Sequence, residues 1–241
     1  MQVRISNLRL FLLVIVLIAG KNSLAQDTIT SVDYGLRLAK DKQYQQAISV
    51  FDRCVKSYPL NPNVYFYLGN AYLDLMQFEK AAEKFSRTIF YDTAYTDAYF
   101  NRASCYFQIK NYTLAYQDYT KVIALESNNT NAYYLRGNCS YKLGKFAAAL
   151  VDYEVALKAN QNDHEMEYAM ANAYFSMENF EQALIHYDRA IQLNNSFSDY
   201  YFNRAITEYN LGFPEDACAD FSNAKDLGDL EAEGYIKELC K

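Results

Sequence analysis

Residues 130–163 read TNAYYLRGNCSYKLGKFAAALVDYEVALKANQND, and the pattern in this stretch decides the fold. The stretch has a small residue at Gly137, aromatic residues at Phe146 and Tyr153, and an alanine at Ala149. That alanine recurs every 34 residues, at positions 47, 81, 115, 149, 183 and 217. Because chance does not keep such a period over six copies, the sequence predicts an array of structural repeats.

Three further columns keep the same register. Four positions after each alanine an aromatic residue follows: Phe51, Phe85, Tyr119, Tyr153, Tyr187 and Phe221. Twelve positions before it stands a small residue: Gly35, Gly69, Ala103, Gly137, Ala171 and Ala205. Three positions before it are Tyr44, Phe78, Tyr112, Phe146, Phe180 and, breaking the series, Pro214. Steps of seven between aromatic residues keep them on one helical face, and small residues let two helices approach closely.

The period and the columns resemble the tetratricopeptide repeat family, in blocks 28–61, 62–95, 96–129, 130–163, 164–197 and 198–231. The resemblance implies an all-α fold, a right-handed superhelical solenoid of six helix pairs. In the second block the helices are expected from Pro62 to about Leu75 and from Phe78 to Tyr91. One pair cannot bury its apolar face alone, so neighbouring pairs stack.

The end of the array has the composition of a cap. Glu208 and Lys225 stand where earlier blocks have apolar residues, which favours a polar last repeat. Gly228 is expected to end a helix, and residues 232–241 are expected to form a capping helix.

Composition and charge exclude several classes of protein. Of the 241 residues 51% are hydrophobic, which excludes a disordered chain, and 8 glycines with 3 prolines are too few for an all-β fold. Beyond residue 25 the chain has 20 basic against 29 acidic groups, a balance of −9. Such an acidic body argues against nucleic acid or an anionic membrane as a partner.

Residues 1–25 have the order of a secretory signal peptide. Arg4 and Arg9 precede the apolar run from Leu10 to Gly20, and Ser23 and Ala25 are small residues at the positions before the expected cleavage after Ala25. The run of 11 residues is short for a membrane span, although an uncleaved anchor is the alternative. We therefore expect an exported protein, periplasmic or secreted, with residues 26–241 as the solenoid and no membrane span after cleavage.

Patterns that support catalysis are missing from the sequence. The chain has two histidines, His164 and His186, no CxxC pair and no glycine-rich phosphate loop. These absences argue against a metal site and histidine-based catalysis. We expect a protein that is not an enzyme and that needs no cofactor or metal.

The five cysteines divide into two groups. Cys54, Cys105 and Cys139 occupy columns of small buried residues, which favours inert core thiols. Cys218 and Cys240 fit no such column, and a turn at Gly228 would bring the capping helix back towards Cys218. We predict a disulfide between Cys218 and Cys240; five free thiols, or pairing through Cys54, are the alternatives.

Arginine and aspartate occur together in three blocks. Arg102, Arg136 and Arg204 precede the small residue, and Asp118, Asp152 and Asp220 follow sixteen positions later. The other blocks lack both charges, so the two columns change together. This favours an ion pair between the two helices of one repeat, and a basic clamp for a ligand is the alternative.

In the family, the first helices of successive repeats line the concave side. One face of these helices carries aromatic residues around a polar line, which predicts a peptide-binding groove. Its residues are Phe66, Asn70, Phe100, Ser104, Phe107, Tyr134, Asn138, Tyr141, Tyr168, Asn172, Phe175, Phe202 and Tyr209. The alternative is that these rings only pack the solenoid.

The function expected from these features is a protein–protein interaction scaffold that binds a peptide or protein segment in the groove. The alternative is a structural subunit of an envelope assembly that packs through its ends or its convex face.

Overall fold

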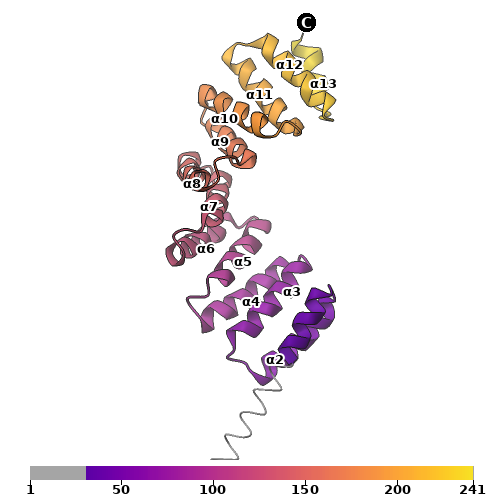
Figure 1. Cartoon of the computed structure of the whole chain (residues 1–241), viewed down its shortest axis with the longest axis vertical. Helices are drawn as coiled ribbons and strands as arrows, with labels where there is room; N and C mark the ends of the chain where they lie inside the picture. Colours follow the sequence, from indigo (N-terminus) through magenta and orange to yellow (C-terminus); the bar gives the residue numbers. More distant parts are fainter. Residues whose placement is uncertain (1–30, 241) are drawn as a thin grey trace, which may run out of the picture. The chain divides into compact units, whose positions relative to one another are not determined.

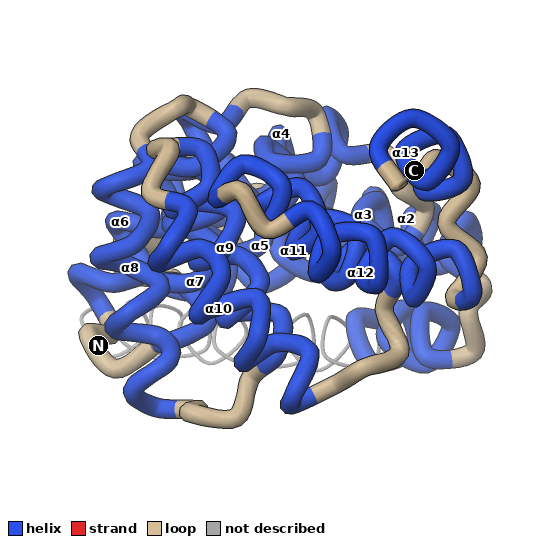
Figure 2. The backbone as a smooth tube through the Cα atoms, turned by 90° about the horizontal axis from the view of Figure 1, so that it is seen from above, coloured by secondary structure: helices blue, strands red, loops and turns tan. Residues whose placement is uncertain are grey.

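The computed structural model describes residues 31–240, and this part of the chain consists of α-helices without any β-strand (Figure 1). Figure 2 shows that short loops join consecutive helices. After the helical residues 31–40, the helices are α2 (Tyr44–Ser57), α3 (Pro62–Asp74), α4 (Phe78–Tyr91), α5 (Thr96–Gln108), α6 (Tyr112–Leu125), α7 (Thr130–Lys142), α8 (Phe146–Ala159), α9 (His164–Ser176), α10 (Phe180–Leu193), α11 (Ser198–Leu211), α12 (Pro214–Asp226) and α13 (Ala232–Leu239). The predicted all-α arrangement of helix pairs is confirmed, and the predicted signal segment, residues 1–25, lies outside the described residues.

Short polar side chains start many of these helices. The side chain of Asn129 accepts a hydrogen bond of 3.0 Å from the backbone N–H of Ala132 at the start of α7. Asp163 accepts two such bonds at the start of α9, and Asn111 and Asn179 cap α6 and α10 in the same way. These caps satisfy backbone N–H groups that have no partner within the helix.

The turn inside each helix pair uses one residue with a left-handed backbone. These residues are 34 positions apart and have φ between 56° and 84°: Lys42, Met76, Lys110, Gly144, Glu178 and Gly212. Only two of them are glycine, the residue that adopts this conformation without steric cost. The turn geometry is therefore repeated in all six pairs, although the residue type is not.

The small column of each repeat makes room for a ring of the second helix. A Cβ atom added to Gly137 would lie 2.6 Å from Cε1 of Tyr153, and one added to Gly69 would lie 2.6 Å from Cε1 of Phe85. Both rings are fully buried. The close approach of the two helices is therefore a consequence of the small residue, as the sequence predicts.

The chain forms two compact units that divide between Ile109 and Lys110. The first unit contains the described helices up to α5, and the second contains α6 to α13. Within the second unit, each helix packs against the next along the chain. None of the helices in residues 31–240 has both the length and the apolar character needed to span a bilayer.

The second unit ends in the predicted capping helix. α13 packs against α12, and Tyr235 lies 5.3 Å from the Phe202 ring and 5.1 Å from the Phe221 ring, between ring centroids. α12 ends at Asp226, and Gly228 follows with φ of 98°. The polar last repeat is only partly as expected, because Lys225 is exposed whereas Glu208 is buried.

Candidate functional site

The first helices of the second unit carry the predicted groove residues on a shared face. We call this set the first-helix face, and it consists of Tyr134, Asn138 and Tyr141 in α7, Tyr168, Asn172 and Phe175 in α9, and Phe202 and Tyr209 in α11. Tyr209 is 46% exposed and the other members are half-buried. The remaining predicted residues, Phe66, Asn70, Phe100, Ser104 and Phe107, are half-buried on α3 and α5 of the first unit.

Each ring near the start of a first helix packs against the buried ring of its own repeat. The ring centroids of Tyr134 and Tyr153 are 5.8 Å apart, and the Tyr168–Tyr187 distance is the same. In the sixth repeat the Phe202–Phe221 distance is 5.7 Å, and in the first unit Phe66 and Phe85 are also 5.7 Å apart. These rings therefore belong partly to the core while their outer edges remain accessible.

The asparagines of the first-helix face have partners inside the protein. The hydroxyl of Tyr153 donates a hydrogen bond of 2.8 Å to Oδ1 of Asn138. Burial raises the pKa of Tyr134, and a hydrogen bond from Asn138 opposes that effect. Asn138 thus connects two tyrosines of its own repeat. Its role as a contact for a peptide backbone stays a prediction.

The predictions from the repeat columns do not include these polar partners, although a sequence pattern marks them. The residue fifteen positions before a second-helix tyrosine is polar, as at Asn138 and Asn172, whereas the residue before Phe221 is Ile206. A buried phenol needs an acceptor and a phenylalanine ring does not. At Phe85 the residue fifteen positions earlier is polar although the ring has no hydroxyl group. This residue, Asn70, instead accepts a hydrogen bond of 2.9 Å from Asn101.

Hydrogen bonds also join neighbouring first helices. The side-chain amide of Asn203 in α11 donates a hydrogen bond of 2.6 Å to the hydroxyl of Tyr168 in α9. The hydroxyl groups of Tyr141 in α7 and Ser176 in α9 are 3.2 Å apart. Tyr168 also stacks on Tyr200, with ring centroids 4.5 Å apart. These contacts fix the positions of several rings before any ligand arrives.

The predicted ion pairs are confirmed in the fourth and sixth repeats. Nη2 of Arg136 donates to Oδ1 of Asp152 at 2.7 Å and Nε donates to Oδ2 at 2.9 Å. Arg204 binds Asp220 in the same two-pronged way, with Nη2 donating to Oδ1 at 2.9 Å. The two residues of the third predicted pair, Arg102 and Asp118, belong to different units.

The same arginines also reach the second helix of the preceding repeat. Nη1 of Arg204 donates to Asp188 in α10 at 2.7 Å, and Nη1 of Arg136 donates to Thr120 in α6 at 3.4 Å. In the first unit, Nη1 of Arg102 donates to Ser86 at 2.9 Å. Protein side chains already occupy these guanidinium groups, and the arginines thereby join neighbouring repeats.

The structure places Cys218 and Cys240, the predicted pair, in a disulfide with Cα atoms 5.7 Å apart. Cys54, Cys105 and Cys139 are buried and form no disulfide. Burial raises the pKa of the Cys105 and Cys139 thiols to about 12, so they are poor nucleophiles. Within residues 31–240, no three His, Cys, Asp or Glu side chains are arranged to hold a metal ion.

Solved structures of similar fold contain helix pairs of the same kind. YrrB, described as a TPR protein with an unusual peptide-binding site, has a TM-score of 0.68 at 19% identity, covering 78% of this chain and 98% of YrrB. PilF of Pseudomonas aeruginosa has a TM-score of 0.69 at 18% identity, covering 90% and 99%. MamA of Desulfovibrio magneticus RS-1 has a TM-score of 0.67 at 18% identity, covering 69% and 94%. At these identities the likeness shows the fold alone.

Sequence comparison gives the family directly. Profiles of the tetratricopeptide repeat match residues 34–95, 96–129, 130–163 and 165–197. Comparison with curated protein sequences gives no match. The sixth helix pair lies beyond the matched residues, yet it has the turn at Gly212 and the packed Phe202–Phe221 rings of the others. By its repeat profiles and its helix pairs, the chain belongs to the tetratricopeptide repeat family.

Proposed function

We propose that the chain is a scaffold for protein–protein interactions and that its second unit binds an extended, partly apolar peptide across the first-helix face. The observation that carries the proposal is the recurrence of half-exposed rings in three successive first helices, most of them held by contacts within the protein. Tyr168, for example, contacts Tyr187, Tyr200 and Asn203. Rings that are already fixed lose little conformational entropy on binding, so their contact area favours affinity.

The chemistry of the face defines the ligand further. The residues of the first-helix face include no lysine or arginine, so it lacks the charge that would attract an acidic C-terminus. Asn138 and Asn172 already accept hydrogen bonds from Tyr153 and Tyr187. The main contribution is therefore apolar contact with ring edges, and the ligand that fits is rich in aliphatic or aromatic side chains.

The test is a selection of peptides from a displayed random library against the full chain, followed by affinity measurements. The variant Phe175→Glu combined with Tyr209→Glu places charge on the first-helix face. Val151→Glu is the matched control, because Val151 is 61% exposed on α8 of the same unit.

We expect the double variant to bind selected peptides at least about tenfold more weakly, since charge beside apolar ring contacts is costly. Val151→Glu should leave the affinity unchanged. Weakening by Val151→Glu alone would support the alternative of contacts through the convex face. Circular dichroism and thermal unfolding establish that each variant is folded.

We also propose that the protein is exported and that residues 1–25 are removed. The disulfide between Cys218 and Cys240 supports an oxidising compartment, where such bonds persist. N-terminal sequencing of protein exported by a secreting host should start at Gln26. A chain that still begins at Met1 and extracts with the membrane would contradict the proposal.

A further inference from the structure

The fifth repeat replaces three residues that act together in its neighbours. In the fourth repeat Arg136 binds Asp152 and lies over the ring of Tyr133, with 5.4 Å between the guanidinium carbon and the ring centroid. The sixth repeat has the same set, Tyr201, Arg204 and Asp220. The fifth repeat has Glu167, Met170 and His186 at these positions. It therefore lacks both the tyrosine ring and the guanidinium group.

The replacement leaves a carboxylate almost completely buried. Glu167 in α9 is 4% exposed. A hydrogen bond of 2.6 Å joins Nδ1 of His186 to Oε2 of Glu167, and the His186 ring stacks on Tyr174 at a centroid distance of 5.2 Å. His186 therefore fixes one carboxylate oxygen and the orientation of the group.

The other oxygen of Glu167, Oε1, accepts no hydrogen bond from the part of the chain that the structure describes. Nη1 of Arg189 lies 3.8 Å from Oε1, which is within ion-pair distance but beyond hydrogen-bonding distance. The Arg189 side chain is 56% exposed, and the described residues form no other ion pair with it. Oε1 is not one of the buried polar atoms without a partner in the described residues, so it borders the pocket and can be reached by a ligand.

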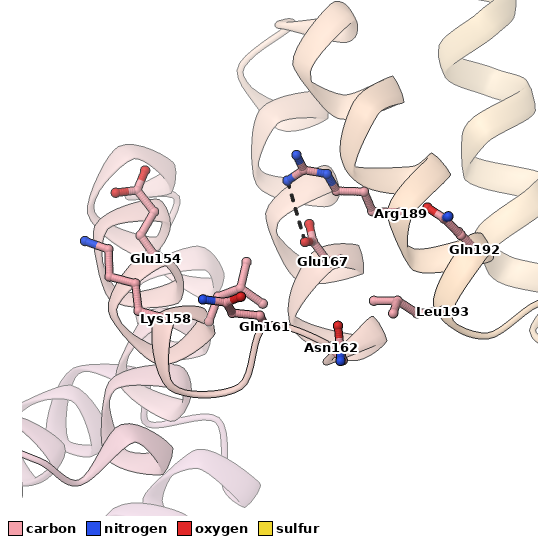
Figure 3. A pocket seen from close by; sticks show the side chains of 9 residues that line it. Glu154, Lys158, Gln161, Asn162, Glu167, Arg189, Gln192 and Leu193 are labelled. Atoms are coloured by element: carbon pink, nitrogen blue, oxygen red, sulfur yellow. Dashed lines mark ion pairs between the residues drawn. The ribbon is translucent and has the colours of Figure 1, made fainter.

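Glu167 lines a pocket of about 490 Å³ between α8 and α10. Figure 3 shows the Arg189 side chain extending over Glu167, while Glu154 and Lys158 stand on the opposite wall, on α8. Leu157 and Leu193 provide apolar surface, and Gln161, Asn162 and Gln192 add side-chain amides.

We propose that this pocket binds an arginine or lysine side chain of a protein partner. Leu157 and Leu193 would pack against its methylene groups, Oε1 of Glu167 would accept from its charged end, and the amide oxygens would accept the remaining N–H groups. Arg189 would move outwards, so one cation replaces another and the charge balance is kept. The pocket lining also includes Lys158 and Arg189, which an anionic ligand would contact instead, so the test includes an anionic probe.

The test uses N-acetyl-arginine methylamide as the probe and N-acetyl-glutamate methylamide as its anionic counterpart, each titrated into the full chain and followed by NMR. We expect the arginine probe to shift amide signals around Glu167 and Leu193, with no response to the glutamate probe. Glu167→Gln keeps an oxygen for His186 but removes the charge, and should weaken binding about tenfold. Glu165→Gln is the matched control, since Glu165 is exposed on the same helix and does not line the pocket.

Arg189→Ala separates the two classes of ligand. Removal of the competing guanidinium should strengthen binding of the arginine probe several-fold, a result that loss of folding cannot imitate. Binding of the glutamate probe that weakens in Arg189→Ala would show an anion site and overturn the proposal. It is also overturned if neither probe binds, or if Glu165→Gln and Glu167→Gln weaken binding equally.

Discussion

The hydroxyl of Tyr187 in α10 donates a hydrogen bond of 2.6 Å to the side-chain oxygen of Asn172 in α9. Tyr187 is 1% exposed, and burial raises its pKa, so the phenol stays protonated and needs an acceptor. Asn172 therefore serves the core as well as the first-helix face. The same relationship joins Tyr153 to Asn138 in the preceding repeat.

Loss of this acceptor should destabilise the fold. Asn172→Leu leaves the buried hydroxyl of Tyr187 without a partner, and we expect it to lower the free energy of unfolding by about 1–3 kcal/mol. Combination with Tyr187→Phe should restore much of the loss, because the sixth repeat pairs Ile206 with Phe221 at these positions. Chemical denaturation of the two single variants and the double variant measures the coupling; strictly additive effects would contradict it.

The ion pair of the fourth repeat gives a second prediction. Asp152 is 4% exposed, so Arg136→Met leaves a buried charge without its partner. We expect a loss of about 3 kcal/mol in unfolding free energy, and recovery of much of it when Asp152→Leu is added. Urea denaturation decides this prediction. A double variant as unstable as the sum of the singles would show that the two residues do not cooperate.

The turns of the helix pairs predict opposite effects for two substitutions. Glu178 has φ of 59° and Gly144 has φ of 73° in equivalent turns. Glu178→Gly should stabilise the protein by about 0.5–1 kcal/mol, because it removes backbone strain at some cost in chain entropy. Gly144→Ala should destabilise it by about 1 kcal/mol. Thermal unfolding should therefore move in opposite directions, and a shift in the same direction would contradict the assigned turn geometry.

Glu208 should make stability depend on pH. Burial raises the pKa of Glu208 to about 7, the nearby charge of Asp220 adds to the effect, and its Oε2 atom has no hydrogen bond. Because the folded state holds this proton more tightly than the unfolded state, stability contributed by the protonated group is lost as the pH rises from about 4.5 to 7.

Glu208→Gln removes the charge at every pH. We expect it to raise the unfolding free energy by roughly 1–3 kcal/mol at pH 8 and to change it little near pH 4.5. Denaturation curves at the two pH values measure the difference. A gain at low pH that equals the gain at high pH would contradict the ionised, buried state of Glu208.

The sequence was sufficient for features that depend on residue type at a fixed period. The alanine and aromatic columns predicted the helix pairs, the joint change of arginine and aspartate predicted the ion pairs, and two cysteines outside the alanine columns predicted the disulfide. In each case the physical requirement restricts the residue type. A small gap accepts only glycine or alanine, and a buried charge needs its opposite.

The remaining features depend on conformation or on three-dimensional proximity. The left-handed turn has the period of 34, but lysine, methionine and glutamate tolerate it, so no glycine column marks it. Glu167 and His186 break separate columns and meet only in the folded repeat. Glu208 has the composition of a surface residue, yet the packing of the last repeat buries it.

Peptide binding by the first-helix face is the central claim, and cross-linking tests it most directly. A peptide selected on the full chain, carrying a photoreactive phenylalanine analogue, is irradiated in the complex, and the attachment sites are identified by mass spectrometry. We predict attachment within residues 134–141, 168–175 and 202–209. Attachment confined to the exposed residues Ala147, Ala148, Val151 or Ile185 on α8 and α10 would contradict it.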